Sequence, residues 1–352
     1  MLRDFSAVNY LPILSMRPAE MRALEELPEK TKNLLLPIVH LRPWTTAHKL
    51  DAVIQRIEDA YSNRPIIIGV GPQEAESTRP VHHDLDRLRK PEDGFVEWCD
   101  FMREHDNYIP CVQLSLEALH ETRQIESLYA LGRGIVFVVP RQAFAALPVL
   151  ASRVSRLTDG GHGVIFVMDL EKTGATDLVE ASARAPQIAD IKFRCPNCFV
   201  SISGSSFPET FVGIEEQEIF ERRVFNLLPD KNRLIYSDRG SARCESKRGG
   251  GGTPAPRIDY PLPNEWYFYR AEDKPGFVGY EEQAQILVKT GIWNPMLRVW
   301  GTQMIERTAS GDTSAISSPG RATAARINIH LQRQTFYDDP ALAEDTDEDW
   351  EE

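Results

Sequence analysis

The sequence predicts an α/β protein, a (β/α)8 barrel of the TIM type that carries a C-terminal α+β appendage and a disordered acidic tail. Eight short apolar runs are spread fairly evenly over the first 240 residues. Nearly all of the gaps between these runs are wide enough to hold a helix. The chain has 352 residues, whereas a bare barrel needs roughly 250, so about 100 residues remain for an appendage.

The eight runs are the predicted strands. They are rich in Ile, Val, Leu and Phe, and each is followed by polar residues, Gly or Pro. Runs that are short and continuously apolar suit parallel strands that are buried on both faces. The predicted strands cover residues 10–15, 34–41, 65–70, 109–114, 134–139, 163–169, 198–203 and 233–237.

Apolar residues at helical spacing predict a helix in most of the gaps. In 50–61, for example, Leu50, Val53, Ile57 and Tyr61 fall on one face. The predicted helices cover residues 18–27, 50–61, 95–103, 116–131, 142–157, 176–188 and 215–228. The polar segment 73–91 is long, and we interpret it as an excursion over the barrel mouth that could act as a lid.

The chain is expected to divide into four parts. Residues 1–245 form the barrel, 246–257 a Gly/Pro-rich loop, 258–337 an extension on the barrel, and 338–352 the acidic tail. Within the extension we predict a strand at 265–270, helices at 283–290 and 323–334, and a loop at 309–321. We expect the last helix to pack on the outside of the barrel or to cover one of its ends.

The formal net charge of −12 is concentrated at the C-terminus, because nine acidic residues lie in 338–352. The rest of the chain is nearly neutral and shows no broad basic surface, so we do not expect duplex nucleic acid as a partner. The simplest interpretation is that the tail is a solvating segment. It could also be a docking peptide anchored by Trp350, or a mimic of nucleic acid.

A cytoplasmic protein without a membrane segment is expected. There is no apolar stretch of about 20 residues, and the N-terminus lacks a basic start followed by an apolar core. Five cysteines, an odd number, fit a reducing compartment. The Cys195-Pro-Asn-Cys198 pair is half of a zinc knuckle and no second pair follows it, so we predict no metal site.

Candidate functional residues follow the predicted strands, because barrels place their sites at the C-terminal ends of the strands. Asp169 and Asp238 are candidate bases, and His40 is a candidate acid/base. The alternative interpretation is that each carboxylate pairs with a neighbouring arginine and that His40 is a hydrogen-bonded rim residue. The sequence names no cofactor.

The segments after the seventh and eighth strands suggest a site for a phosphorylated small molecule or a nucleotide. Barrels often bind phosphate there through small residues and exposed N–H groups, and arginines add bidentate contacts. Small residues are also the usual materials of tight turns. The candidate ligand-binding residues are Arg42, Arg141, Ser203, Gly204, Ser205, Ser206, Arg239 and Gly240.

Four segments resemble the Beta protein family of bacteriophages and bacteria. They are the opening Tyr10-Leu-Pro-Ile-Leu-Ser with Leu36-Pro-Ile-Val-His-Leu-Arg-Pro43, the run Leu234-Ile-Tyr-Ser-Asp238, and Ala325-Arg-Ile-Asn-Ile-His-Leu331. The resemblance implies a barrel and a setting near mobile elements or phage-conflict genes, and it implies no reaction. This chain has His40 where the family pattern would place an acidic residue, which leaves Glu20, Asp169 and Asp238 as acidic candidates.

Two functional interpretations follow. The first is an enzyme that acts on a phosphorylated small molecule or nucleotide at the barrel mouth. The second is a non-catalytic barrel that docks on a neighbouring protein through its C-terminal extension and acidic tail.

Overall fold

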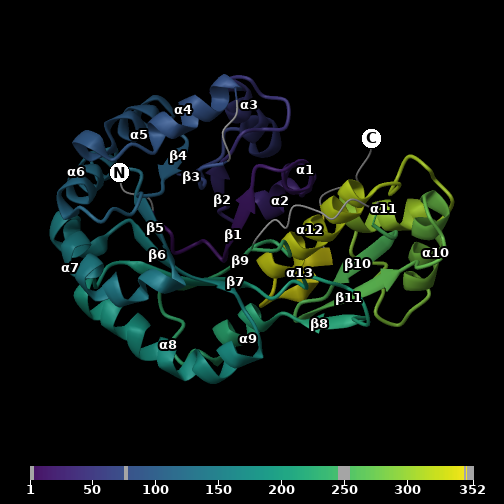
Figure 1. Ribbon diagram of the computed structural model, residues 1–352. Coiled ribbons are helices and arrows are strands. Elements are labelled where there is room, and N and C mark those ends of the chain that lie inside the picture. The colour runs from purple at the N-terminus through teal and green to yellow at the C-terminus, as the bar shows by residue number, and fades with distance from the viewer. Residues whose placement is uncertain (1–3, 75–77, 245–253, 345, 347–352) are drawn as a thin grey trace.

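Eight parallel strands form a nearly closed barrel (Figure 1). The computed structural model describes residues 4–74, 78–244, 254–344 and 346. The strands are hydrogen-bonded in the order β4-β3-β2-β1-β9-β7-β6-β5. An isolated bridge between Cys111 and Val136 links the two ends of this order. The barrel strands are β1 (Tyr10–Ser15), β2 (Ile38–Leu41), β3 (Ile66–Val70), β4 (Tyr108–Pro110), β5 (Ile135–Pro140), β6 (Val164–Lys172), β7 (Phe199–Ser205) and β9 (Leu234–Asp238).

Helices cover the outside of the strands, and Figure 1 shows α3 to α8 as an arc around them. The helices of this part are α1 (Pro18–Glu25), α2 (Glu29–Lys32), α3 (Leu50–Tyr61), α4 (Pro80–Leu88), α5 (Glu92–Glu104), α6 (Ala118–Tyr129), α7 (Leu147–Leu157), α8 (Ala175–Arg194) and α9 (Phe220–Leu227), with 3-10 turns at Arg141–Ala146 and Asp159–Gly161. None of the helices in the described ranges is long and apolar enough to cross a bilayer.

The barrel interior is filled by one set of alternating strand residues. This inner layer contains Leu11, Ile38, Ile67, Ile109, Val136, Ile165 and Ile235. Because side chains alternate between the two faces of a strand, positions two or four residues further along also point inward. Those positions, at the C-terminal end of the barrel, are His40, Asp169, Ser203 and Arg239.

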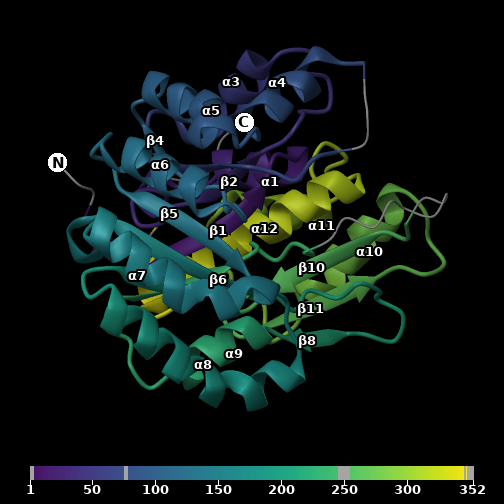
Figure 2. The ribbon, with the colours of Figure 1, turned by 60° about the vertical axis from the view of Figure 1, so that its left-hand side comes forward.

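A second, antiparallel sheet lies beside the barrel (Figure 2). It consists of β10 (Arg257–Pro261), β11 (Glu265–Arg270) and the short β8 (Glu216–Glu218). The helices of this part are α10 (Phe277–Leu287), α11 (Trp300–Ala309), α12 (Pro319–Thr335) and α13 (Pro340–Glu344). Side chains from β10, α10, α11 and α12 form its own apolar core, which includes Ile258, Leu287, Trp300 and Ile329.

Helix α12 belongs to both parts of the molecule. It packs against α1 and β1 on one side and against β10 and α11 on the other, and nearly all of its residues from Ala324 to Thr335 are buried. It therefore occupies the position of the eighth barrel helix, although about 80 residues separate it from the eighth strand, β9. The barrel is completed only by a helix from the C-terminal part of the chain.

A buried carboxylate joins this helix to the barrel. Asp238, at the end of β9, has no exposed surface. It accepts hydrogen bonds from Tyr10 Oη, from Tyr236 Oη at 2.8 Å, from His330 Nε2 of α12 at 2.8 Å, and from the N–H of Gly240 at 2.7 Å. Burial alone would raise the pKa of Asp238, but His330, Tyr10 and Gly240 outweigh it, and the pKa lies below its ordinary value.

Four sequence-based expectations differ from the structure. The polar segment 73–91 contains helix α4, whose Val81, Leu85 and Leu88 are buried at helical spacing, and this helix was not predicted. The predicted helix 215–228 begins only at Phe220, because residues 216–218 pair with β11 as β8. Helix α11 was not predicted; its Gly301 allows close contact with α12, where a Cβ would lie 2.4 Å from the Ala325 carbonyl oxygen.

The fourth difference concerns the expected disordered tail, 338–352. Residues 340–344 form α13, with Ala343 buried. Residues 345 and 347–352 lie outside the described ranges, as do residues 246–253 of the expected Gly/Pro-rich loop. Residues 254–257 of that loop are described, and Arg257 already belongs to β10.

We predict that Asp238→Ala lowers the free energy of unfolding by at least about 3 kcal/mol, because it leaves a buried imidazole, two hydroxyls and an N–H without their acceptor. Urea denaturation of the variant measures this loss. Asp273→Ala, at an exposed position, is the control and should change stability by less than about 0.5 kcal/mol. A loss at Asp238 as small as that of the control would contradict the structural role of the cluster.

Candidate functional site

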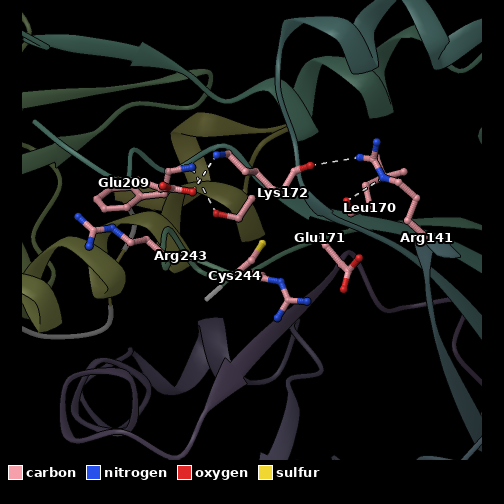
Figure 3. A pocket seen from close by; sticks show the side chains of 10 residues that line it. Arg141, Leu170, Glu171, Lys172, Glu209, Arg243 and Cys244 are labelled. Atoms are coloured by element: carbon pink, nitrogen blue, oxygen red, sulfur yellow. Dashed lines mark hydrogen bonds and ion pairs between the residues drawn. The ribbon is translucent and has the colours of Figure 1, made fainter. Parts of the chain in front are cut away.

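A cavity of about 460 Å³ opens at the C-terminal ends of β5, β6, β7 and β9 (Figure 3). This volume is in the range typical of small-molecule sites. The lining residues come from these strand ends and from the segments that follow β7 and β9. They are Arg141, Leu170, Glu171, Lys172, Ser205, Phe207, Glu209, Arg239, Arg243 and Cys244.

A bulge in β6 forms one wall of the cavity. The pairing of β6 with β7 shifts register between Asp169 and Lys172. Within this bulge Glu171 has a φ of 59°, a left-handed conformation that is strained for a residue other than glycine. The backbone N–H of Glu171 donates to Asp169 Oδ1 at 2.9 Å. The bulge therefore turns the side chain of Glu171 toward the cavity that it lines.

Arg141 fixes the bulge from the other side. Its Nε donates to the carbonyl oxygen of Leu170 at 3.1 Å, and its Nη2 donates to that of Lys172 at 3.2 Å. The same guanidinium forms an ion pair with Asp177 at 2.7 Å. Arg141 thus binds the carbonyls on both sides of Glu171, which holds the strained residue in place.

Asp169 and Arg239 form an ion pair at the base of the cavity. The Asp169 carboxylate is buried, while Arg239 reaches the cavity. The Nε of Arg239 is buried and has no hydrogen-bond partner among the described residues. This guanidinium consequently has an unused donor beside its carboxylate partner.

His40 lies close enough to the Asp169–Arg239 ion pair for both charges to change its pKa. Its pKa is lowered to about 4, because burial disfavours the charged imidazole and Arg239 repels it, whereas Asp169 acts in the opposite direction. His40 is therefore neutral at neutral pH. It also contacts Gly69: a Cβ on this glycine would lie 2.6 Å from the imidazole Cδ2.

Glu20 is a further carboxyl group near the mouth. It is buried and accepts a hydrogen bond from the backbone N–H of Ser15. Burial raises the pKa of Glu20 to about 7, against the lowering effects of the Ser15 bond and of nearby arginines, which include Arg17 and Arg239.

The remaining charged lining residues are Lys172, Glu209 and Arg243. Lys172 Nζ and Glu209 form an ion pair at 2.7 Å. Arg243 Nε donates to the carbonyl oxygen of Pro208 at 2.8 Å, and its guanidinium lies over the Phe211 ring. Among the described residues Arg243 has no carboxylate partner.

Two of the expected phosphate-binding N–H groups already have partners. The N–H of Ser206 donates to Glu221 at 2.9 Å, and the N–H of Gly240 donates to Asp238 at 2.7 Å. Ser205 lines the cavity, but its hydroxyl donates to the carbonyl oxygen of Ala242. Gly204 faces away from the cavity, where a Cβ would collide with the Thr173 hydroxyl. The Ser203 hydroxyl is buried without a partner in the described part of the chain.

The structure brings some candidates together and separates others. Arg141, Ser205 and Arg239 line the cavity, and Asp169 lies directly behind Arg239. Arg42 does not line it, and its Nε pairs with Glu74 at 3.0 Å. Asp238 is also absent from the lining, because its carboxylate points toward α12. Within the described ranges no group of three His, Cys, Asp or Glu side chains could hold a metal ion.

Glu171 and Arg243 line the cavity but were not among the sequence-based site residues. The only signal for Glu171 was its place two residues after Asp169 at the end of an apolar run. Strand alternation alone could not orient it, because the bulge changes the alternation. Arg243 follows β9 in an irregular segment, for which sequence patterns give no side-chain direction.

We predict that His40 titrates near pH 4 in an NMR titration of its ring protons. In Arg239→Gln the titration midpoint should rise, because a repelling charge is lost while Asp169 remains. His40→Gln identifies the resonance, and Arg42→Gln, which removes a weaker influence, should move it less. A midpoint near the unperturbed value of about 6.5 that is the same in the wild type and in Arg239→Gln would show that His40 lies away from the ion pair.

A family model and an individual phage protein both match nearly the whole chain. A family model described as Beta protein matches residues 10–336. The chain is also 27% identical over 343 residues to a protein of Enterobacteria phage P4 called Protein beta, with 94% of each chain covered. Three of the four segments that carry the resemblance contribute Tyr10, Tyr236, Asp238 and His330, which meet in the buried cluster behind β9. The chain belongs to the Beta protein family.

Proposed function

We propose that this protein binds a phosphorylated small molecule, such as a nucleotide, at the C-terminal mouth of the barrel. The observation that carries the proposal is the cavity of about 460 Å³, which Arg239 and Arg243 reach from the segment after the eighth barrel strand. Barrel proteins commonly bind phosphate beside their seventh and eighth strands.

The proposed anion contacts are side chains rather than a cradle of N–H groups. Arg239 lines the cavity beside its ion pair with Asp169, and in the described structure Arg243 donates to a carbonyl oxygen and lies over an aromatic ring. Guanidinium groups bind phosphate oxygens with paired, charge-assisted hydrogen bonds. Two such groups four residues apart on one segment suit a single phosphoryl group.

If the protein also turns this ligand over, Asp169 and His40 are the groups best placed to move a proton. Asp169 lies behind Arg239, and a ligand that drew the guanidinium away would leave this carboxylate free to accept a proton. Asp238 takes no part in this proposal, because it is fully buried and already accepts four hydrogen bonds.

We further propose a cytoplasmic setting in conflict between phage and host. All five cysteines are free, which suits a reducing compartment. A relative that covers nearly the full chain comes from a phage, which supports the phage setting.

Isothermal titration with AMP, ribose 5-phosphate and inorganic pyrophosphate tests the proposed binding. We expect Arg243→Gln to weaken binding of these compounds about tenfold, since a hydrogen bond to a charged group contributes about 1.5–3 kcal/mol. This variant leaves no described carboxylate without its partner. Arg42→Gln is the matched control and should bind like the wild type, because Arg42 pairs with Glu74 outside the lining. Absence of binding to the wild type at millimolar concentrations would refute the proposal.

A second candidate function is docking on a protein encoded beside this chain. An apolar groove of about 290 Å³ lies between α6 and α7, and its rim includes the fully exposed Leu116 and the largely exposed Val149. Exposed apolar side chains gathered at one groove are typical of interaction surfaces.

For docking we expect co-purification with the neighbouring protein after co-expression, lost in Leu116→Asp and retained in Arg243→Gln. Co-purification that is retained in Leu116→Asp and lost in Arg243→Gln would instead favour the ligand site. Circular dichroism and thermal melting of both variants serve as the folding control.

A further inference from the structure

Glu171 differs from the ion-paired residues of the cavity. Arg141 pairs with Asp177, Arg239 with Asp169, and Lys172 with Glu209. The side chain of Glu171 has no hydrogen bond or ion pair to any described residue, although its backbone N–H donates to Asp169. In Figure 3 its carboxylate has no dashed line and lies between Arg141 and Cys244.

The backbone holds this carboxylate at a conformational cost. Glu171 has a φ of 59°, in the left-handed region, which is unfavourable for a residue with a side chain. Asn and Gly accept this conformation more readily. Against the lowering effect of burial, Asp169, Cys244 and Glu171 raise the pKa of Arg239, so the Glu171 carboxylate attracts this guanidinium at longer range. No direct hydrogen bond of its side chain to a described residue offsets the strain.

The surroundings nevertheless enforce this position. Asp169 accepts the N–H of Glu171, and Arg141 binds the carbonyls of both neighbours, Leu170 and Lys172. Strain that is fixed from several directions at a cavity wall is typical of residues that contact ligands. The bulge therefore presents one unpaired carboxylate to the cavity.

We propose that Glu171 determines which phosphorylated ligands the cavity accepts, by receiving hydrogen bonds from ligand hydroxyl groups. A carboxylate repels phosphate oxygens and accepts hydrogen bonds from hydroxyl donors. With the phosphate on Arg239 and Arg243, the ligand class becomes phosphorylated polyols, such as a sugar phosphate or the ribose of a nucleotide. The inference rests on the proposed phosphate site.

The test compares two ligands that share a phosphate and differ in hydroxyl groups. Affinities of ribose 5-phosphate and inorganic phosphate are measured by isothermal titration for the wild type and for Glu171→Gln, which keeps the size of the side chain. We expect ribose 5-phosphate to bind the variant about tenfold or more weakly. Inorganic phosphate should bind equally well or more tightly, because a negative charge has been removed.

Glu209→Gln is the matched control. It removes one negative charge from the same lining, but Glu209 is already paired with Lys172. It should therefore leave the ratio of the two affinities near the wild-type value. An unchanged ratio in Glu171→Gln would overturn the proposal while leaving the phosphate site intact. Failure of the wild type to bind either ligand would overturn the phosphate site, and the role of Glu171 with it.

A third ligand and a second variant separate the remaining outcomes. If phosphoethanolamine, which carries an ammonium group, is the ligand that Glu171→Gln selectively loses, Glu171 recognises a cation and the polyol assignment is wrong. Glu171→Gly should keep or raise the melting temperature, because glycine relieves the left-handed strain, while it loses the preference for ribose 5-phosphate. A clear fall in melting temperature would instead show that the side chain supports the fold.

Discussion

The buried Asp238 carboxylate is the interaction on which the arrangement of this molecule depends. It binds side chains from β1, from β9 and from α12, and these segments lie far apart in the sequence, with 228 residues between Tyr10 and Asp238. A carboxylate without exposed surface is tolerated only when its hydrogen-bonding capacity is filled. The cluster therefore specifies one position for α12 against the barrel, where apolar packing alone would be less selective.

The same carboxylate shapes the site beside it. Asp238 also holds the N–H of Gly240, so the chain turns immediately after β9, and Gly240 and Ser241 both have positive φ angles. This turn carries Arg239 to the ion pair with Asp169 and leads to Arg243, which also lines the cavity. The structural cluster and the candidate site thus share one strand end, with the carboxylate facing outward and Arg239 facing the mouth.

Strand cores were the most predictable part of this protein. Buried parallel strands need continuous apolar runs, so the runs ending at Ser15, Val70 and Asp169 marked the barrel, and with it the end where a site should lie. Long-range choices were not predictable. Residues 216–218 became a strand through pairing with β11, and α12 became the eighth barrel helix through contacts with distant segments. Within the site, Arg239 followed from its place after the eighth strand, whereas the β6 bulge that orients Glu171 left no local pattern.

The late position of α12 in the chain has a consequence for synthesis on the ribosome. The outer faces of β1 and β9 are made early, but their covering helix ends only at Thr335. Domains are completed as their residues emerge from the exit tunnel. Until α12 has emerged, the apolar side chains that it covers in the complete protein remain exposed. Contacts of such long sequence separation also slow folding. A ribosome that stops before α12 would release a barrel open on one side, a substrate for chaperones and proteases.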